Sequence, residues 1–273
     1  RNVIPMLSKF FVAGEVSFHL AGVFTIATNI AAVVEMPYRS LGAISRPQIS
    51  DAMAKQDVKQ ADFLCKNVAL HQYIAGTFVF FVIWTNIDLL FDILPNGEVY
   101  RVGKMAVLLL CIGRLVYSTL AVTTTVLSYS KYYYYSLIFT VLLTLMSFFM
   151  NSCFVPKWDI NGGALAYTMS YFIYFILLLA FIKWKIGVLP LTKKMLTVSA
   201  IILVMFGLNW LWMLAITPWF AGLFVKPIYG LLVDGIIKTA VFLLLGTTTV
   251  YKLKISMSVN DLIDKGLKLI HLK

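Results

Sequence analysis

The chain has 273 residues, of which 60% are hydrophobic and 13% charged, with a formal net charge of +11 and a mean hydropathy of +0.87. This composition excludes a water-soluble globular domain and predicts a polytopic membrane protein, because each crossing of a bilayer requires about 20 mostly apolar residues. The positive charge does not indicate nucleic-acid binding, since it is divided unevenly between alternate loops.

Seven segments are long and apolar enough to be predicted as membrane-spanning helices, which makes the expected fold an all-α polytopic bundle. In chain order they are residues 16–44, 67–87, 105–130, 132–156, 160–182, 195–225 and 227–251. Residues 3–13 resemble the end of an earlier span, and the chain starts with Arg1. We therefore expect a C-terminal fragment, in which residues 1–15 end a preceding span and residues 16–254 form a seven-span lobe.

The remaining residues, 255–273, are predicted to form a cytoplasmic amphipathic tail, because apolar side chains recur there at helical spacing. If alternate loops lie on opposite sides of the membrane, one side holds 14 of the 23 Lys and Arg residues and the other holds 5. Cytoplasmic loops carry the excess of basic residues, so we predict that the C-terminus is cytoplasmic.

Ionisable side chains within the spans are the main functional candidates, because a charge at the bilayer centre costs roughly 2.5–3.5 kcal/mol on insertion scales. Arg114 lies midway along span 105–130 without an acidic residue within one turn. Glu35, Arg39 and Arg46 share one face of the first span, provided that the kink expected at Pro37 does not rotate it. We predict that Arg39, Arg46 and Arg114 bind substrate, although Glu35 and Arg39 also fit a structural pair.

Small and hydroxylated residues continue these faces at steps of three and four. They are Thr28, Ala32 and Gly42 on the first span, Ser118, Ala121, Thr125 and Ser128 on the third, and Thr140, Thr144, Ser147 and Asn151 on the fourth. Such faces line water or allow helices to approach closely, so we predict that they line a hydrophilic cavity.

Asp234 and Lys238 lie four residues apart on the last span and allow two interpretations. The two side chains neutralise each other as a structural pair, or they serve ion coupling together with Glu35. A buried carboxylate such as Glu35 suits the carriage of a proton or ion, because burial and a nearby arginine shift its proton affinity in opposite directions.

Signals for catalysis or metal binding are weak throughout the sequence. Three histidines lie near span ends, and there is no HExxH, CxxC or P-loop motif. The three cysteines lack the spacing of metal ligands and do not suggest a disulfide framework. We therefore expect no enzyme activity, no metal and no cofactor.

Two stretches resemble a known family. The sequence GVFTIATNIAAVVEMPYRSLGAISRPQISDAMAKQD, residues 22–57, is similar to the eighth helix of polysaccharide flippases in the multidrug, oligosaccharidyl-lipid and polysaccharide exporter superfamily. The sequence NSCFVPKWDINGGALAYTMSY, residues 151–171, is similar to that family's N-x-x-x-I-P-x-x-G-I-x-G-A-A-x-A-T stretch. Asp159 stands in place of the expected Gly, and Gly163 in place of the first Ala. The resemblance covers most of the chain.

The resemblance implies one lobe of a two-lobed, MATE-like transporter that works by alternating access. The implied activity is the translocation of undecaprenyl-linked oligosaccharide repeat units across the bacterial inner membrane, for surface polysaccharide and lipopolysaccharide O-antigen biosynthesis. The implied partners are the lipid-linked substrate, membrane lipids, an N-terminal lobe of the same protein and polysaccharide polymerase machinery. Family members often line the cavity with basic residues, which matches Arg39, Arg46 and Arg114 by type of position.

Two other functions remain as alternatives. A cation-coupled multidrug exporter of the same superfamily requires acidic cavity residues for cationic drugs, whereas the surplus here is basic. An integral-membrane polysaccharide polymerase or glycosyltransferase requires catalytic residues on large outer loops, whereas the predicted outer loops are short. A purely structural scaffold does not explain charges placed within the spans.

Overall fold

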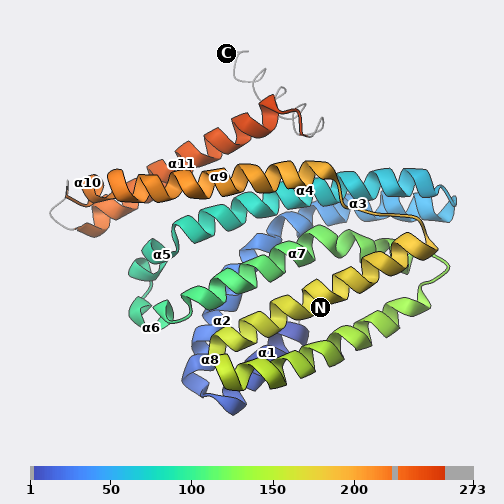
Figure 1. The fold of residues 1–273 in the computed structure, drawn as a ribbon, viewed down its shortest axis with the longest axis horizontal. Helices are drawn as coiled ribbons and strands as arrows, with labels where there is room; N and C mark the ends of the chain where they lie inside the picture. Colours follow the sequence, from blue (N-terminus) through green and yellow to red (C-terminus); the bar gives the residue numbers. More distant parts are fainter. Residues whose placement is uncertain (1–2, 223–226, 256–273) are drawn as a thin grey trace.

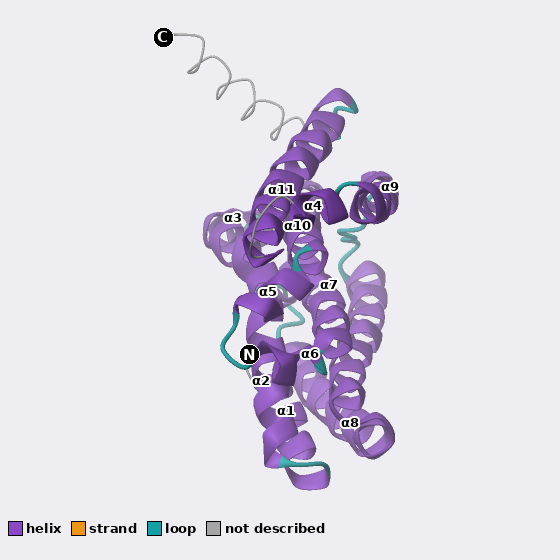
Figure 2. Ribbon diagram, turned by 90° about the vertical axis from the view of Figure 1, so that its left-hand side faces the viewer, coloured by secondary structure: helices purple, strands orange, loops and turns teal. Residues whose placement is uncertain are grey.

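The computed structural model describes residues 3–222 and 227–255, and every regular element in this part of the chain is a helix (Figures 1 and 2). The helices are α1 Val3–Glu15, α2 Phe18–Ala32, the 3₁₀ turn η1 Val33–Glu35, α3 Met36–Ala54, α4 Val58–Thr85, α5 Ile87–Ile93, α6 Gly97–Arg101, α7 Lys104–Ser128, α8 Tyr134–Lys185, α9 Lys193–Ala215, α10 Thr217–Gly222 and α11 Pro227–Lys252. The predicted all-α class is confirmed.

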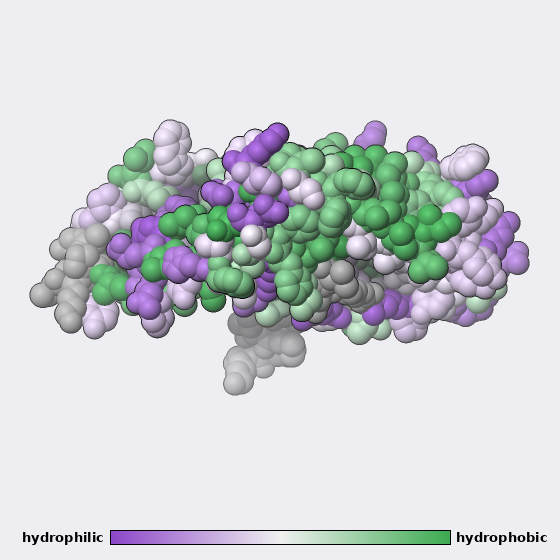
Figure 3. Space-filling view, turned by 90° about the horizontal axis from the view of Figure 1, so that it is seen from below, coloured by the Kyte–Doolittle hydropathy of each residue, from purple (hydrophilic) through white to green (hydrophobic). Residues whose placement is uncertain are grey.

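Six helical segments in the described part are long and apolar enough to cross a membrane. They are Phe18–Ala54, Val58–Thr85, Lys104–Ser128, Tyr134–Lys185, Lys193–Ala215 and Ile228–Lys252. Apolar side chains cover a broad area of the face shown in Figure 3, and hydrophilic ones gather toward the two ends of the long axis. The chain thus has the character of a multi-pass membrane protein. The predicted amphipathic tail lies outside the described residues, apart from Ile255.

One predicted span ends earlier than the hydropathy pattern suggested. The segment 195–225 contains α9, which ends at Ala215, and then the separate short helix α10. Pro218 lies in the first turn of α10, and α9 cannot continue through it, because proline has no amide hydrogen to donate and its ring clashes with the preceding turn of a helix. Hydropathy alone does not detect such a break, because residues on both sides of it are apolar.

The predicted spans 132–156 and 160–182 correspond to the two arms of α8. The helix reverses at Trp158 and Asp159, which have non-helical backbone angles, so that the arms lie side by side (Figure 1). Phe139 on the first arm contacts the ring of Phe181 on the second, with ring centroids 5.4 Å apart. The turn predicted between these spans is therefore present, within a single long element.

Replacement of Asp159 by glycine is expected to stabilise the protein. Asp159 has φ 50° and ψ −128°, a conformation that residues with a Cβ rarely adopt and that costs on the order of 1–3 kcal/mol. Glycine relieves this strain but adds about 0.5–1 kcal/mol of unfolded-state entropy, so we expect a net gain of about 1 kcal/mol. Thermal unfolding in detergent measures it as a higher midpoint. Lys157→Gly, in the same turn, is the control and should lower the midpoint; an equal decrease for Asp159→Gly would contradict the argument.

The first predicted span is broken where the sequence places Pro37. Helix α2 ends at Ala32, the 3₁₀ turn covers residues 33–35, and α3 starts at Met36 with Pro37 in its first turn. Proline is tolerated there because the first amides of a helix have no partner within it. The predicted kink is confirmed, and it places Glu35 at the junction of two helices.

Helix α7 lies at the centre of the bundle and packs against α2, α3, α4 and α8. The loops α3–α4, α7–α8 and α8–α9 gather at one end of the molecule (Figure 1). Seven lysines lie in these loops or within three residues of them: Lys55, Lys59, Lys131, Lys183, Lys185, Lys193 and Lys194. Part of the charge asymmetry of the sequence is therefore also an asymmetry in space.

Candidate functional site

A buried ion pair joins the broken first span to the central helix. Arg114 Nη1 of α7 donates a hydrogen bond to Glu35 Oε1 of η1, and their side chains are 10% and 7% exposed. The Arg114 guanidinium also lies over the ring of Tyr167, with Cζ 5.3 Å from the centroid. Arg39 Nη2 lies 3.9 Å from the other oxygen, Oε2, but its side chain is 68% exposed. Glu35 therefore pairs mainly with Arg114 and only weakly with Arg39.

Arg114 retains an unused donor. Its Nε atom is buried and has no hydrogen-bond partner among the described residues. A buried donor without a partner costs about 1–3 kcal/mol. The described residues thus leave this guanidinium incompletely satisfied.

Next to the pair lies a cavity of about 290 Å³, which we term the basic cavity. Three cations line it, Lys9 of α1, Arg39 of α3 and Arg114 of α7, together with the polar side chains of Thr28 and Asn29 on α2. No carboxylate lines the cavity, and Glu35 offsets only one of the three charges. The cavity is therefore electropositive and suited to an anion, which arginine binds through charge-assisted hydrogen bonds.

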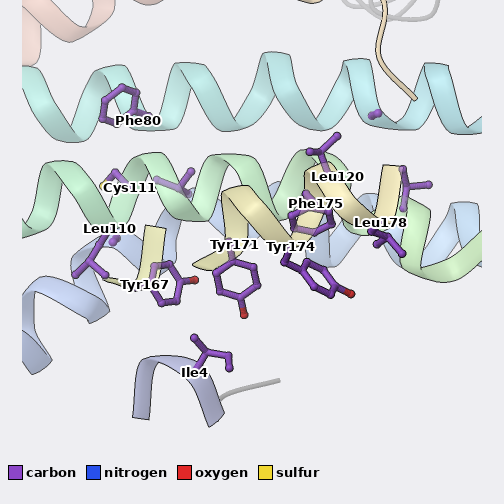
Figure 4. Close-up of a cluster of buried hydrophobic side chains, with 14 of the residues drawn as sticks. Ile4, Phe80, Leu110, Cys111, Leu120, Tyr167, Tyr171, Tyr174, Phe175 and Leu178 are labelled. Atoms are coloured by element: carbon purple, nitrogen blue, oxygen red, sulfur yellow. The ribbon is translucent and has the colours of Figure 1, made fainter. Parts of the chain in front are cut away.

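A second cavity of about 290 Å³ lies between α1, α7 and the two arms of α8, and we term it the hydroxyl cavity. Its lining carries no charge. Hydroxyl groups dominate it, from Thr124, Ser128, Ser136, Thr140 and Thr144. Tyr117, Tyr171 and Tyr174 add phenolic groups, and Figure 4 shows Tyr171 extending from α8 toward the segment of α1 that carries Ile4.

The hydrogen bonds of this lining determine what it offers a ligand. Thr124 and Ser128 donate to carbonyl oxygens of α7, at 2.7 and 2.8 Å. Thr140 and Thr144 do the same within α8, at 2.8 and 3.0 Å. Each of these hydroxyls keeps lone pairs that can accept a hydrogen bond from a ligand. Combined with tyrosine rings, such a surface suits a neutral molecule that carries several hydroxyl groups.

The two cavities share their walls. On α7, Arg114 lines the basic cavity and Tyr117, Thr124 and Ser128 line the hydroxyl cavity, at spacings of one helical face. On α1, Ile4 lines the hydroxyl cavity and Lys9 the basic one. The basic cavity and the hydroxyl cavity are therefore both lined by residues of α1 and α7.

The predicted polar faces are only partly in these cavities. Thr28, Ala32, Ser128, Thr140 and Thr144 line them. Other members pack within the bundle: Ser118 bonds to the Leu115 carbonyl, and Asn151 bonds to Ser147. Close packing is the other use of such faces.

Arg46, a predicted substrate-binding residue, lines neither cavity. Its Nη2 donates to the Tyr38 hydroxyl at 3.3 Å, and its guanidinium lies 5.7 Å from the centroid of that ring. Tyr38 in turn packs edge-on against Tyr117, with centroids 5.7 Å apart. The structure thus brings together Arg39 and Arg114 in the basic cavity, whereas Arg46 contacts Tyr38 outside it.

Asp234 and Lys238 form a separate buried cluster where α4, α9, α10 and α11 meet. Asp234 accepts hydrogen bonds from Trp212 Nε1 at 2.8 Å and Thr217 Oγ1 at 2.9 Å. Lys238 Nζ lies 4.0 Å from Asp234 Oδ2 and donates to the carbonyl of Thr85, the last residue of α4, at 3.0 Å. Neither residue lines the basic or the hydroxyl cavity. These contacts connect four helices, as a structural pair would.

Sequence reasoning missed Lys9 and Asn29 of the basic cavity, Tyr167 beside Arg114, and the tyrosines of the hydroxyl cavity, which are Tyr117, Tyr171 and Tyr174. Lys9 was assigned to the end of an earlier span, and Tyr167, Tyr171 and Tyr174 repeat at apolar helical spacing, which is typical of a core. Asn29, one residue after Thr28, offered a signal, because an amide within an apolar span is unusual.

No three His, Cys, Asp or Glu side chains lie together as a possible metal site in the part of the chain that the structure describes. Comparisons with protein-family models, with curated proteins and with solved structures find no match to this chain.

Proposed function

We propose that this chain forms one lobe of a flippase for lipid-linked oligosaccharides. The observation that carries the proposal is the pairing of the basic cavity with the hydroxyl cavity along α1 and α7. A lipid-linked oligosaccharide joins an anionic pyrophosphate to neutral or acidic sugars, and its lipid remains in the bilayer. A multi-pass protein with adjacent anion and polyol sites suits each part of that molecule.

Further support comes from the turn of α8. The family stretch that residues 151–171 resemble has Gly where this chain has Asp159, and Asp159 adopts a backbone conformation that favours glycine. The glycine of the family stretch and the backbone conformation that favours glycine thus fall at the same position, that of Asp159. Under the proposal the lobe has seven spans, the two arms of α8 counting separately, and belongs to a MATE-like, two-lobed protein of the bacterial inner membrane with a cytoplasmic C-terminus.

In the mechanism we propose, Arg39, Arg114 and Lys9 hold the pyrophosphate while the sugars occupy the hydroxyl cavity. Rocking of this lobe against a second lobe then opens the shared space to the other side of the membrane. Glu35 serves as the coupling group, because a bound anion competes with it for Arg114. Asp234 and Lys238 fit a structural role better than coupling, since hydrogen bonds to neighbouring helices already satisfy the carboxylate.

Deletion of the full-length reading frame tests the function. We expect lipid-linked repeat units to accumulate in the cytoplasmic leaflet and surface polysaccharide to be lost. Sensitivity to cationic drugs with normal surface polysaccharide would instead identify a multidrug exporter. Repeat units that reach the outer leaflet but stay unpolymerised would identify a polymerase.

Complementation of that strain with Arg39→Ala tests the basic cavity. Translocation should decrease about 10- to 100-fold, since a hydrogen bond to a charged group is worth about 1.5–3 kcal/mol. Protein abundance on an immunoblot should not change, because the side chain is 68% exposed. Arg39→Lys should restore only part of the activity, as a point charge lacks the planar fork of arginine.

Arg101→Ala is the matched control, because Arg101 pairs with Asp92 at a partly exposed position away from both cavities. It should translocate normally. Wild-type translocation by Arg39→Ala would contradict the assignment of the basic cavity.

A further inference from the structure

A third cavity, of about 370 Å³, lies at the end of the molecule where the α3–α4, α7–α8 and α8–α9 loops gather (Figure 1). Its polar lining consists of Gln56, Tyr129, Ser130, Lys131, Tyr132 and Lys185. No carboxylate lines it. We term it the lysine cavity, and the flippase proposal makes no use of it.

The carboxylates of this end are engaged elsewhere. Asp51 pairs with Lys55 at 2.7 Å, and Asp62 pairs with Lys66 and accepts the Leu189 amide at 2.9 Å. Asp57 caps α4 by accepting the Gln60 amide at 2.9 Å. Neither Lys131 nor Lys185 has a carboxylate partner among the described residues. Their two positive charges are therefore not neutralised by the protein.

An alternative role for these lysines is to balance the C-terminal ends of α3, α7 and α8, which carry partial negative charge. In the described structure, however, neither ammonium group hydrogen-bonds a carbonyl of those ends. Lys131 Nζ lies over the ring of Tyr132 at 5.3 Å, and Lys185 Nζ over that of Trp184 at 3.7 Å. The lysines are held by aromatic faces, which leaves their three N–H donors available.

The position of these aromatic rings indicates the depth of the cavity in a membrane. Four aromatic residues follow or precede the lining residues Tyr132 and Lys185 in sequence and are 40–74% exposed: Tyr133, Tyr134, Tyr135 and Trp184. Tyrosine and tryptophan gather at the level of lipid headgroups. Ser130 fixes the loop by accepting the Tyr132 amide at 3.1 Å, so Lys131 is held in a defined turn at that level.

We propose that the lysine cavity binds the phosphate of an anionic phospholipid. The cavity resembles the basic pockets that hold phosphate headgroups in membrane proteins. It lies at headgroup depth between the ends of helices, and its two ammonium groups have no carboxylate partner among the described residues. A free phosphate ester shares this chemistry, but the exposed tyrosines beside the cavity favour a ligand that remains in the bilayer. The site is a surface for lipid and does not depend on the flippase proposal.

Native mass spectrometry of the detergent-purified full-length protein tests this site. Titration with phosphatidylglycerol should give selective retention over phosphatidylcholine. Lys131→Gln combined with Lys185→Gln should weaken phosphatidylglycerol binding about 25-fold, since each lysine at a membrane surface contributes about a factor of five. Lys131→Arg with Lys185→Arg should keep the binding, which also shows that changes at these exposed positions permit folding.

Lys193→Gln combined with Lys194→Gln is the charge-matched control, because both lysines are exposed at the start of α9, near the same end. It should bind as the wild type does. Equal weakening in both pairs would identify unspecific attraction, and unchanged binding in the Lys131 and Lys185 pair would rule out the cavity; either result overturns the proposal. Displacement of the lipid by millimolar glycerol 3-phosphate would assign the site to a free phosphate ester and overturn the lipid assignment.

Discussion

Arg114→Ala is expected to destabilise the protein by about 3–5 kcal/mol, because it leaves the Glu35 carboxylate buried without its partner. Arg39 cannot fully replace Arg114, since its guanidinium is 3.9 Å from Glu35 and mostly exposed. The measurements are the yield of monodisperse protein and the midpoint of thermal unfolding in detergent. We expect both to decrease clearly below those of Arg39→Ala.

A double-mutant cycle separates this pair from a general loss of packing. Glu35→Gln combined with Arg114→Gln removes both charges and should be more stable than Arg114→Gln alone. The loss of stability in the double mutant should be smaller than the sum of the two single losses by about 0.5–3 kcal/mol. If the two single losses simply add, the ion pair is not the cause. Because Arg114 stabilises the fold in this way, its role in binding is better tested with Arg114→Lys, which keeps the charge.

Gly162→Ala is expected to cost about 3 kcal/mol or more, the upper part of the range for overpacking. Gly162 lies where the second arm of α8 turns back over the first, and an added Cβ would overlap the carbonyl of Phe154 and lie 2.9 Å from the amide nitrogen of Val155. Backbone atoms cannot move aside as the end of a flexible side chain can. The arms must therefore separate, which lowers the unfolding midpoint.

Gly207→Ala provides the control for this prediction. A Cβ at Gly207, within α9, meets no atom within 4 Å. The substitution should be neutral or stabilising by up to about 1 kcal/mol, since glycine in a helix is entropically unfavourable. Equal decreases of the midpoint for both variants would show that the turn of α8 tolerates a side chain.

Hydropathy and proline placement were sufficient to predict the long apolar helices and the break near Pro37, but not the end of α9 at Ala215 or the short helices α5, α6 and α10. They were not sufficient to pair the charges. The four-residue spacing of Glu35 and Arg39 suggested a local pair, whereas Arg114, 79 residues away, is the main partner. The 3₁₀ turn at residues 33–35 has three residues per turn rather than 3.6, so it changes the register between α2 and α3. A sequence pattern that assumes one straight helix cannot include this change.

The hydroxyl faces show a second limit of prediction from the sequence pattern. Steps of four and three from Arg114 predicted Ser118, Thr125 and Ser128 on the cavity side, whereas Tyr117 and Thr124 lie there with Ser128. These two sets differ by about one residue, or 100° around the helix, and Ser118 is buried within the bundle. Periodicity identifies that a polar face exists, but only the packing of α1 and α8 against α7 decides which residues of that face remain open.

The hydroxyl cavity also has a directional chemistry. Thr124, Ser128, Thr140 and Thr144 already donate their hydroxyl hydrogens to helix carbonyls, so toward a guest they act as hydrogen-bond acceptors only. A sugar with free hydroxyl groups supplies the O–H donors that these oxygens can accept. An O-acetyl or O-methyl group replaces the hydrogen of one sugar hydroxyl, so that oxygen can only accept. An oxygen of the lining and an oxygen of the sugar then face each other without a hydrogen between them. Under the proposed function, these four hydroxyls therefore distinguish glycans by the masking of their O–H groups rather than by their charge, and they favour unmodified sugars.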